Sequence, residues 1–148
     1  MLKGLQFLAL ILLALAMAPA GAHLFALPNK IDLPEDRYFA VQAIYRGWAL
    51  LGIVLVLAIV ANLALTVSLR GRGLPFVLSL AATAVILSTL IIFFVWTYPA
   101  NQATRDWTIA TDNWRELRTQ WEYAHAACAV LTFVALCCAT LSVLTSRP

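Results

Sequence analysis

The stretch GWALLGIVLVLAIVANLALTVSLRGRGLPFVLSLAATAVILSTLIIFFVWTYPANQAT, residues 47–104, contains two long uncharged runs separated only by RGRG at residues 70–73. Each run exceeds the ~20 apolar residues that a helix needs to cross a bilayer. Because backbone amides in lipid must be satisfied within their own segment, the runs predict two membrane-spanning helices. The glycines and the following Pro75 predict a tight hairpin between them.

The rest of the chain has the same character. It is 63% hydrophobic and 11% charged, whereas a soluble domain carries about 25% charged residues. Another uncharged run lies between Glu122 and Arg147, and a further apolar run follows Lys3. We therefore predict an all-α integral membrane four-helix bundle, a single transmembrane domain over residues 1–148. Its predicted spans cover residues 4–27, 42–69, 74–98 and 122–144.

The first apolar segment has a second interpretation. MLKGLQFLALILLALAMAPAGAH has a basic start, an apolar run and small residues at positions 18–22. This pattern is also typical of a secretory signal peptide. We expect the segment to remain as an uncleaved first helix.

Charge distribution predicts the topology. Four spans place both termini on one side, together with four basic residues and no acid: Lys3, Arg70, Arg72 and Arg147. The opposite, outer side carries six basic residues and all seven acids. The positive-inside rule counts basic residues near short loops, so the compact arginine hairpin favours cytoplasmic termini in the plasma or inner membrane. The chain has no run of basic residues that would indicate nucleic-acid binding.

Two long outer connections are polar and aromatic, unlike the inner hairpin. In residues 27–48, Pro28 and Pro34 are predicted to break the helix before the chain enters the second span. In residues 97–126, Pro99 is predicted to end the third span. Because functional residues concentrate on elaborate connections, we expect the function on this side.

The second outer connection contains two series with a period of seven residues. Their members are Trp107, Trp114 and Trp121, and Thr111, Arg118 and His125. The series interleave at spacings of three and four, which places all six on one side of a helix. That helix is predicted to start near Asp112 and to run into the fourth span. Within it, Arg118 and Glu122 are spaced to pair.

Both histidines lie near the outer end of a predicted span, where ionisable groups are costly and indicate function by default. We predict that they share a polar pocket with aromatic walls. The candidate catalytic residues are His125, His23, Arg118 and Lys30. The candidate substrate-binding residues are Asn29, Gln42, Tyr45, Trp48, Asn101, Trp114, Trp121 and Glu122. Each also has a structural interpretation, as a helix–helix hydrogen bond, a snorkelling cation or an interfacial anchor.

Three functions fit these residues. An imidazole exchanges protons near neutral pH and could deprotonate an acidic carbon or phenol, with Arg118 or Lys30 holding the oxyanion. Such an enzyme would need no cofactor, and its tryptophans would suit a flat, lipophilic substrate. Alternatively, His23 and His125 could bind haem, a metal ion or a quinone, although CxxCH and HExxH are absent. The third is a non-catalytic membrane subunit or small-ligand binder.

Two segments carry a family resemblance. HLFALPNKIDLPEDRYFAVQAIYRGWALLG (23–52) and TYPANQATRDWTIATDNWRELRTQWEYAHAACAVL (97–131) resemble the anthrone-oxygenase-like family of small four-helix membrane proteins, long catalogued as a domain of unknown function. The likeness covers about residues 21–144. It implies oxidation of anthrones to anthraquinones with dioxygen and without an evident cofactor. It also implies a site made of His23, Asn29, Lys30, Asn101, Trp114, Arg118, Trp121, Glu122 and His125.

The expected surroundings follow from these interpretations. The bilayer is the expected partner of the spans, and a lipophilic small molecule is the expected ligand of the site. Four alanines in the fourth span allow close helix packing, either within one chain or in a homo-oligomer. They are Ala124, Ala126, Ala127 and Ala129.

Overall fold

The computed structural model describes residues 2–146, so Met1, Pro148 and the Arg147 assigned above to the terminal side lie outside the described residues. Within that range the chain forms helices and no strand. Four segments are long and apolar enough to cross a membrane, judged by length and composition. Their main helices are α1 (Leu2–Lys30), α3 (Gly52–Ser68), α4 (Leu74–Ile92) and α6 (Trp114–Thr145). The predicted all-α four-helix bundle is confirmed.

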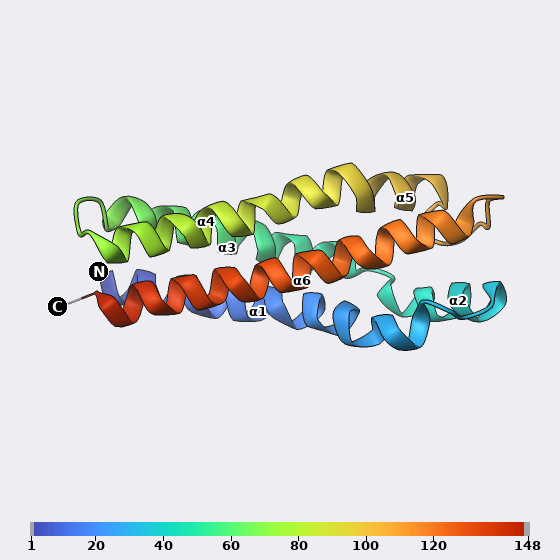
Figure 1. The fold of residues 1–148 in the computed structure, drawn as a ribbon, viewed down its shortest axis with the longest axis horizontal. Coiled ribbons are helices and arrows are strands. Elements are labelled where there is room, and N and C mark those ends of the chain that lie inside the picture. Colours follow the sequence, from blue (N-terminus) through green and yellow to red (C-terminus); the bar gives the residue numbers. More distant parts are fainter. Residues whose placement is uncertain (1, 147–148) are drawn as a thin grey trace.

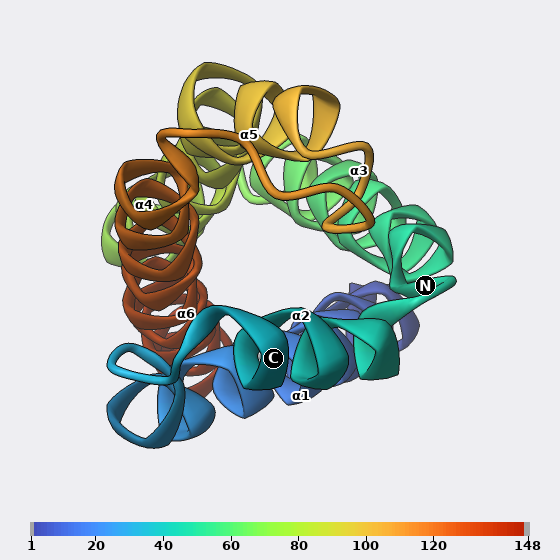
Figure 2. The same ribbon diagram turned by 90° about the vertical axis from the view of Figure 1, so that its right-hand side faces the viewer.

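The four helices form a ring of antiparallel neighbours. Viewed along the bundle, α1 lies between α3 and α6, and α4 completes the ring on the opposite side (Figure 2). Both ends of the chain lie at one end of the bundle (Figure 1). The other end, which we call the distal end, carries the short helices α2 (Glu35–Gln42) and α5 (Tyr98–Ala103).

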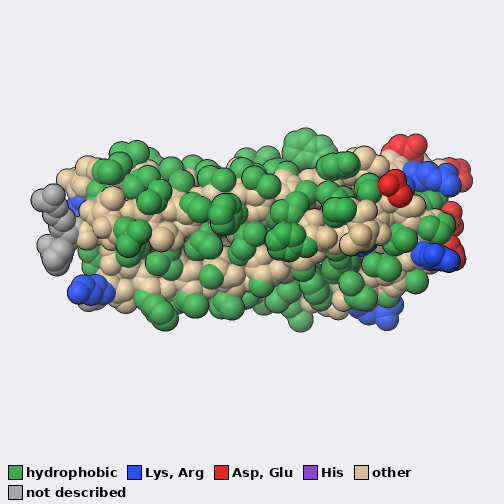
Figure 3. Space-filling view, turned by 60° about the horizontal axis from the view of Figure 1, so that its bottom comes forward, with side chains coloured by type: hydrophobic (Ala, Val, Ile, Leu, Met, Phe, Trp, Pro, Cys, Tyr) green, Lys and Arg blue, Asp and Glu red, His purple; other side chains and the backbone are tan. Residues whose placement is uncertain are grey.

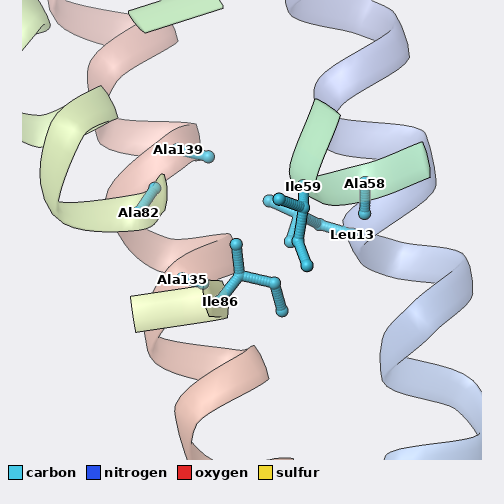
Figure 4. Close-up of a cluster of buried hydrophobic side chains, with 7 residues drawn as sticks. All are labelled: Leu13, Ala58, Ile59, Ala82, Ile86, Ala135 and Ala139. Carbon is cyan, nitrogen blue, oxygen red and sulfur yellow. The ribbon is translucent and has the colours of Figure 1, made fainter. Parts of the chain in front are cut away.

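Small side chains let the helices approach closely in the middle of the bundle. This central cluster contains Leu13, Ala58, Ile59, Ala82, Ile86, Ala135 and Ala139 (Figure 4). Larger apolar side chains such as Phe7, Val60 and Phe133 are exposed around the outside. Hydrophobic side chains cover the length of the molecule, and the visible charges lie near its ends (Figure 3). This distribution fits a bundle whose solvent is lipid.

The first helix is longer than predicted and places two candidate residues on one face. Pro28 does not break α1, which continues to Lys30 with Pro19 and Pro28 inside it. A proline removes only its own N–H donor, and in a membrane-type helix such a loss is tolerated. Because α1 continues, His23 and Lys30 are seven residues apart on the same helix and therefore share a face.

The second span starts later than the predicted Gln42. The chain passes through α2 and a short 3₁₀ turn, η1 (Ala43–Tyr45), before η2 (Trp48–Leu51) leads into α3. Gly47 between the turns has φ of +86°, a left-handed conformation that favours glycine. The direction of the chain therefore changes between Tyr45 and Trp48.

The third span continues past Pro99. After α4 the chain makes one π-helical turn, η3 (Phe93–Thr97), and then continues as α5 to Ala103. The wide turn changes the backbone pairing just before the proline, which has no N–H to donate. Within this turn, the Trp96 carbonyl accepts a hydrogen bond of 2.7 Å from Gln120 Nε2 of α6.

The predicted start of the last helix near Asp112 is two residues early, since α6 begins at Trp114. Trp107 and Thr111 therefore lie in the connection before the helix. Arg105, Asp106 and Trp107 have φ values of +47°, +55° and +61°. The Asp106 N–H donates to the Asn101 carbonyl at 2.7 Å. This connection turns Trp107 back into the bundle, where it is buried.

Candidate functional site

The two histidines stack on each other at the distal end. The ring centroid of His23, from α1, lies 4.1 Å from that of His125, from α6, with 20° between the ring planes. The indole centroid of Trp121 lies 4.1 Å from the ring centroid of His125. Tyr45 lies 4.3 Å from His23, and Trp48 stands edge-on to His23 at 5.6 Å. The prediction that the imidazoles meet at one level of the bundle is confirmed.

A buried ion pair lies beside this stack. Lys30 Nζ is 2.9 Å from Glu122 Oε1, and the two side chains are 4% and 0% exposed. Lys30 also donates a hydrogen bond of 3.0 Å to the Tyr45 hydroxyl. Its ammonium lies 4.4 Å from the Tyr45 ring centroid and 5.1 Å from the Trp121 ring centroid. Tyr45 therefore touches both the cation and the imidazole stack.

Glu122 pairs with Lys30 and not with Arg118, contrary to the spacing along α6. Arg118 Nη1 donates to the Leu33 carbonyl at 2.7 Å. Its guanidinium lies 5.5 Å from the Tyr38 ring and 4.9 Å from the Trp114 ring. The continued α1 helix brings the ammonium to the carboxylate, while Arg118 is used to hold the connection after α1.

Tyr38 is a site residue that the sequence did not reveal, because a tyrosine near a span usually anchors at the interface. It is fully buried, and its hydroxyl donates to Glu122 Oε1 at 2.9 Å. The same hydroxyl accepts a hydrogen bond from Gln42 Nε2. Burial, followed by the nearby Glu122 carboxylate, raises the pKa of Tyr38. The phenol therefore stays protonated and keeps donating to Glu122. The i,i+4 spacing of Tyr38 and Gln42 was the available signal.

Asn101 holds the indole that packs on the histidines. Its Oδ1 accepts hydrogen bonds from Trp121 Nε1 at 2.8 Å and from Trp107 Nε1 at 3.2 Å. Both tryptophans are buried. One amide oxygen thus fixes two indole rings, and through Trp121 it orients one wall of the site.

Replacing Asn101 with leucine is expected to lower the free energy of unfolding by about 1–3 kcal/mol for each indole donor left unpaired. The emission of the tryptophans should change as their hydrogen bonds are lost. Denaturant unfolding followed by fluorescence measures both effects. Gln102→Leu is the matched control, because Gln102 is exposed and its side chain bonds only the Tyr98 hydroxyl among the described contacts. If the two substitutions change the free energy of unfolding and the tryptophan emission equally, Asn101 does not hold the two indoles.

Three of the predicted site residues lie away from the stack. Asn29 is exposed at the end of α1. Trp114 packs with Tyr38 and Phe39 in a neighbouring aromatic cluster, and Arg118 lies over its ring. The remaining candidates form one connected group, which Gln42 joins through Tyr38: His23, Lys30, Gln42, Tyr45, Trp48, Asn101, Trp121, Glu122 and His125.

Aromatic rings pack against both histidines, of which His23 is buried and His125 half-buried. Two surface grooves of about 700 and 400 Å³ are lined by other residues, except that Trp48 borders the smaller one. Several buried atoms nevertheless have no hydrogen-bond partner among the described residues, including His23 Nδ1, Gln42 Oε1 and Glu122 Oε2. Buried polar atoms are normally satisfied, so these atoms have capacity to bond a polar group of a ligand.

As they stack in this structure, the two histidine rings leave no space for a haem iron between them. A metal bound by nitrogens on opposite sides needs those nitrogens about 4 Å apart, and the ring centroids would then lie farther apart still. The observed stack has its centroids 4.1 Å apart. Over residues 2–146, no cluster of three or more histidine, cysteine, aspartate or glutamate side chains could hold a metal ion.

No protein-family model, curated protein or solved structure matches this chain. The fold and the residues at its distal end define its class. It is a four-helix bundle of membrane-span-like helices with a buried lysine–glutamate pair and a histidine-centred aromatic cluster at one end.

Proposed function

We propose that this protein is an anthrone-oxygenase-like membrane enzyme that oxidises a lipophilic aromatic substrate with dioxygen and without a cofactor. The observation that carries the proposal is the junction at Tyr45. Its hydroxyl bonds the buried Lys30 ammonium at 3.0 Å, and its ring lies 4.3 Å from His23. An imidazole and a buried ammonium thus both contact one phenol, and this arrangement supports binding of an acidic hydroxyaromatic ligand beside it.

The proposed roles follow from these positions. His125, supported by the stacked His23, takes a proton from the substrate. Lys30 stabilises the developing oxyanion, and its burial strengthens that interaction. The flat rings of the substrate lie against the side chains of Trp121, Tyr45 and Trp48. Arg118, a sequence candidate for the oxyanion, is assigned instead to positioning the chain at Leu33, which it bonds.

The reaction balances without another reactant. The histidine removes one of the two hydrogens of the anthrone methylene as a proton, leaving an electron-rich anion. Dioxygen adds to that carbon, and the peroxide takes the proton back as a hydroperoxide. The second hydrogen leaves this carbon as a proton while the O–O bond breaks and hydroxide departs. The products are one quinone carbonyl and one water.

The proposed setting is the plasma or inner membrane, with cytoplasmic termini and the site near the outer face. Arg70 and Arg72 in the hairpin between α3 and α4 support this orientation. The exposed apolar side chains along the bundle support lipid as its surroundings.

The test uses the purified protein in lipid nanodiscs with dihydroxyanthrone. We expect quinone to form faster than in empty nanodiscs, with one dioxygen consumed for each quinone. Quinone absorbance and an oxygen electrode measure the two quantities. Binding without turnover would favour a small-ligand binder, and a Soret band in the purified protein would favour haem. Equal rates with and without protein would overturn the proposed enzyme.

A further inference from the structure

An apolar groove on the bundle shares one lining residue, Trp48, with the site described above. It has a volume of about 400 Å³ and lies where α1 meets the start of α3. Its lining carries no charged side chain among the described residues and consists of Leu15, Ala18, Pro19, Trp48, Leu51 and Val54. Large apolar side chains around it, such as Leu50 and Ile53, are exposed. Its volume is in the range of small-molecule sites.

Trp48 borders both this groove and the site. Trp48 lines the groove, and the same ring stands edge-on to His23 at 5.6 Å. It also contacts the Tyr45 ring at 5.0 Å. Trp48 is therefore the residue that the groove lining and the ring contacts of His23 have in common.

The backbone around Trp48 is suited to a displacement of its side chain. Trp48 begins the short 3₁₀ turn η2 and follows Gly47, whose φ is +86°. A Cβ atom at Gly47 would meet nothing within 4 Å. Glycine is therefore needed there for its backbone conformation and not for close packing. Short turns and glycines of this kind are typical of hinge positions.

The histidine behind Trp48 has an unused polar atom. His23 is 7% exposed, and its Nδ1 has no hydrogen-bond partner among the described residues. A buried polar atom without a partner costs free energy unless a ligand supplies one. A hydroxyl group on an otherwise apolar molecule would satisfy it.

We propose that the groove is the lateral entrance from the lipid to the histidine pair, and that Trp48 is its gate. The occupant is one flat, lipophilic aromatic molecule that carries a hydroxyl group for His23 Nδ1. This proposal rests on the proposed function for the identity of the ligand. The apolar lining admits uncharged molecules from the bilayer, whereas the charged distal end faces water.

Two exposed alanines on α1 provide a matched test. Ala18 lines the groove, and Ala14, one turn earlier, does not. In nanodiscs, Ala18→Phe is expected to slow association of dihydroxyanthrone, measured by stopped-flow tryptophan quenching, by about tenfold, and dissociation by a similar factor. Kd should stay nearly unchanged because both directions use the same entrance. Leu51→Ala, which widens the groove, should increase both rates, and Ala14→Phe should leave them unchanged.

A second readout separates this proposal from the enzyme itself. His23→Cys is placed in a background with alanine at Cys128, Cys137 and Cys138, and is labelled with pyrenyl maleimide dissolved in the bilayer. Ala18→Phe should slow this labelling, and Ala14→Phe should not. If the protein binds no anthrone but the labelling difference remains, the entrance stands and the proposed function fails. Equal labelling and equal anthrone rates in the two variants would overturn the entrance.

Discussion

Replacing Glu122 with glutamine is expected to lower the free energy of unfolding by about 3–5 kcal/mol. The substitution keeps the shape of the side chain but leaves the buried Lys30 ammonium without its counter-charge. Lys30 is 4% exposed as a side chain, so water does little to replace the carboxylate. Unfolding by sodium dodecyl sulfate in mixed micelles, followed by circular dichroism, measures the change.

A double substitution tests whether the cost arises from the unpaired charge. Lys30→Met together with Glu122→Gln removes the stranded ammonium, and most of the lost stability should return. Glu116→Gln is the control on the same helix, because Glu116 is exposed and should change stability by less than about 0.5 kcal/mol. Glu122→Gln behaving like Glu116→Gln would show that the ion pair contributes nothing measurable.

Replacing His125 with alanine is expected to reduce kcat for anthrone oxidation by about 10²–10⁴-fold, the usual contribution of a positioned general base. Kd for the substrate should change much less, because the aromatic walls remain. Quinone absorbance in nanodiscs measures kcat, and tryptophan quenching measures Kd. Imidazole added to the buffer should restore part of the lost rate, which a purely structural role of His125 would not allow.

Tyr123→Ala serves as the control for this experiment. Tyr123 is two residues from His125 on α6 but is exposed on the outer surface, so its removal should leave kcat unchanged. His23→Ala distinguishes the role of His23 from that of His125. A smaller loss in kcat than for His125→Ala is expected if His23 supports the base. An unchanged kcat in His125→Ala would refute its role as the base.

The predicted arrangement of side chains agrees with the structure where it depended on spacing along one helix. Trp121 and His125 are four residues apart on α6, and both meet His23. The prediction failed where it depended on helix ends. Pro28 was expected to end the first helix, which would have removed Lys30 from the face of His23. Spacing alone also paired Arg118 with Glu122, although Glu122 bonds Lys30 of α1 and Tyr38 of α2. Arg118 bonds the Leu33 carbonyl just after α1.

The sequence by itself determined the four spans, the tight inner hairpin and the end of the bundle that carries the polar residues. These features are local, because an uncharged run satisfies its backbone hydrogen bonds within its own helix. Only the tertiary structure decided that Lys30 is the partner of Glu122, that Tyr38 also bonds Glu122, and that Trp48 borders both the apolar groove and His23. These contacts depend on the register of α1 against α6 and on the turn at Gly47. That register is set by packing between helices, which spacing within one helix does not encode.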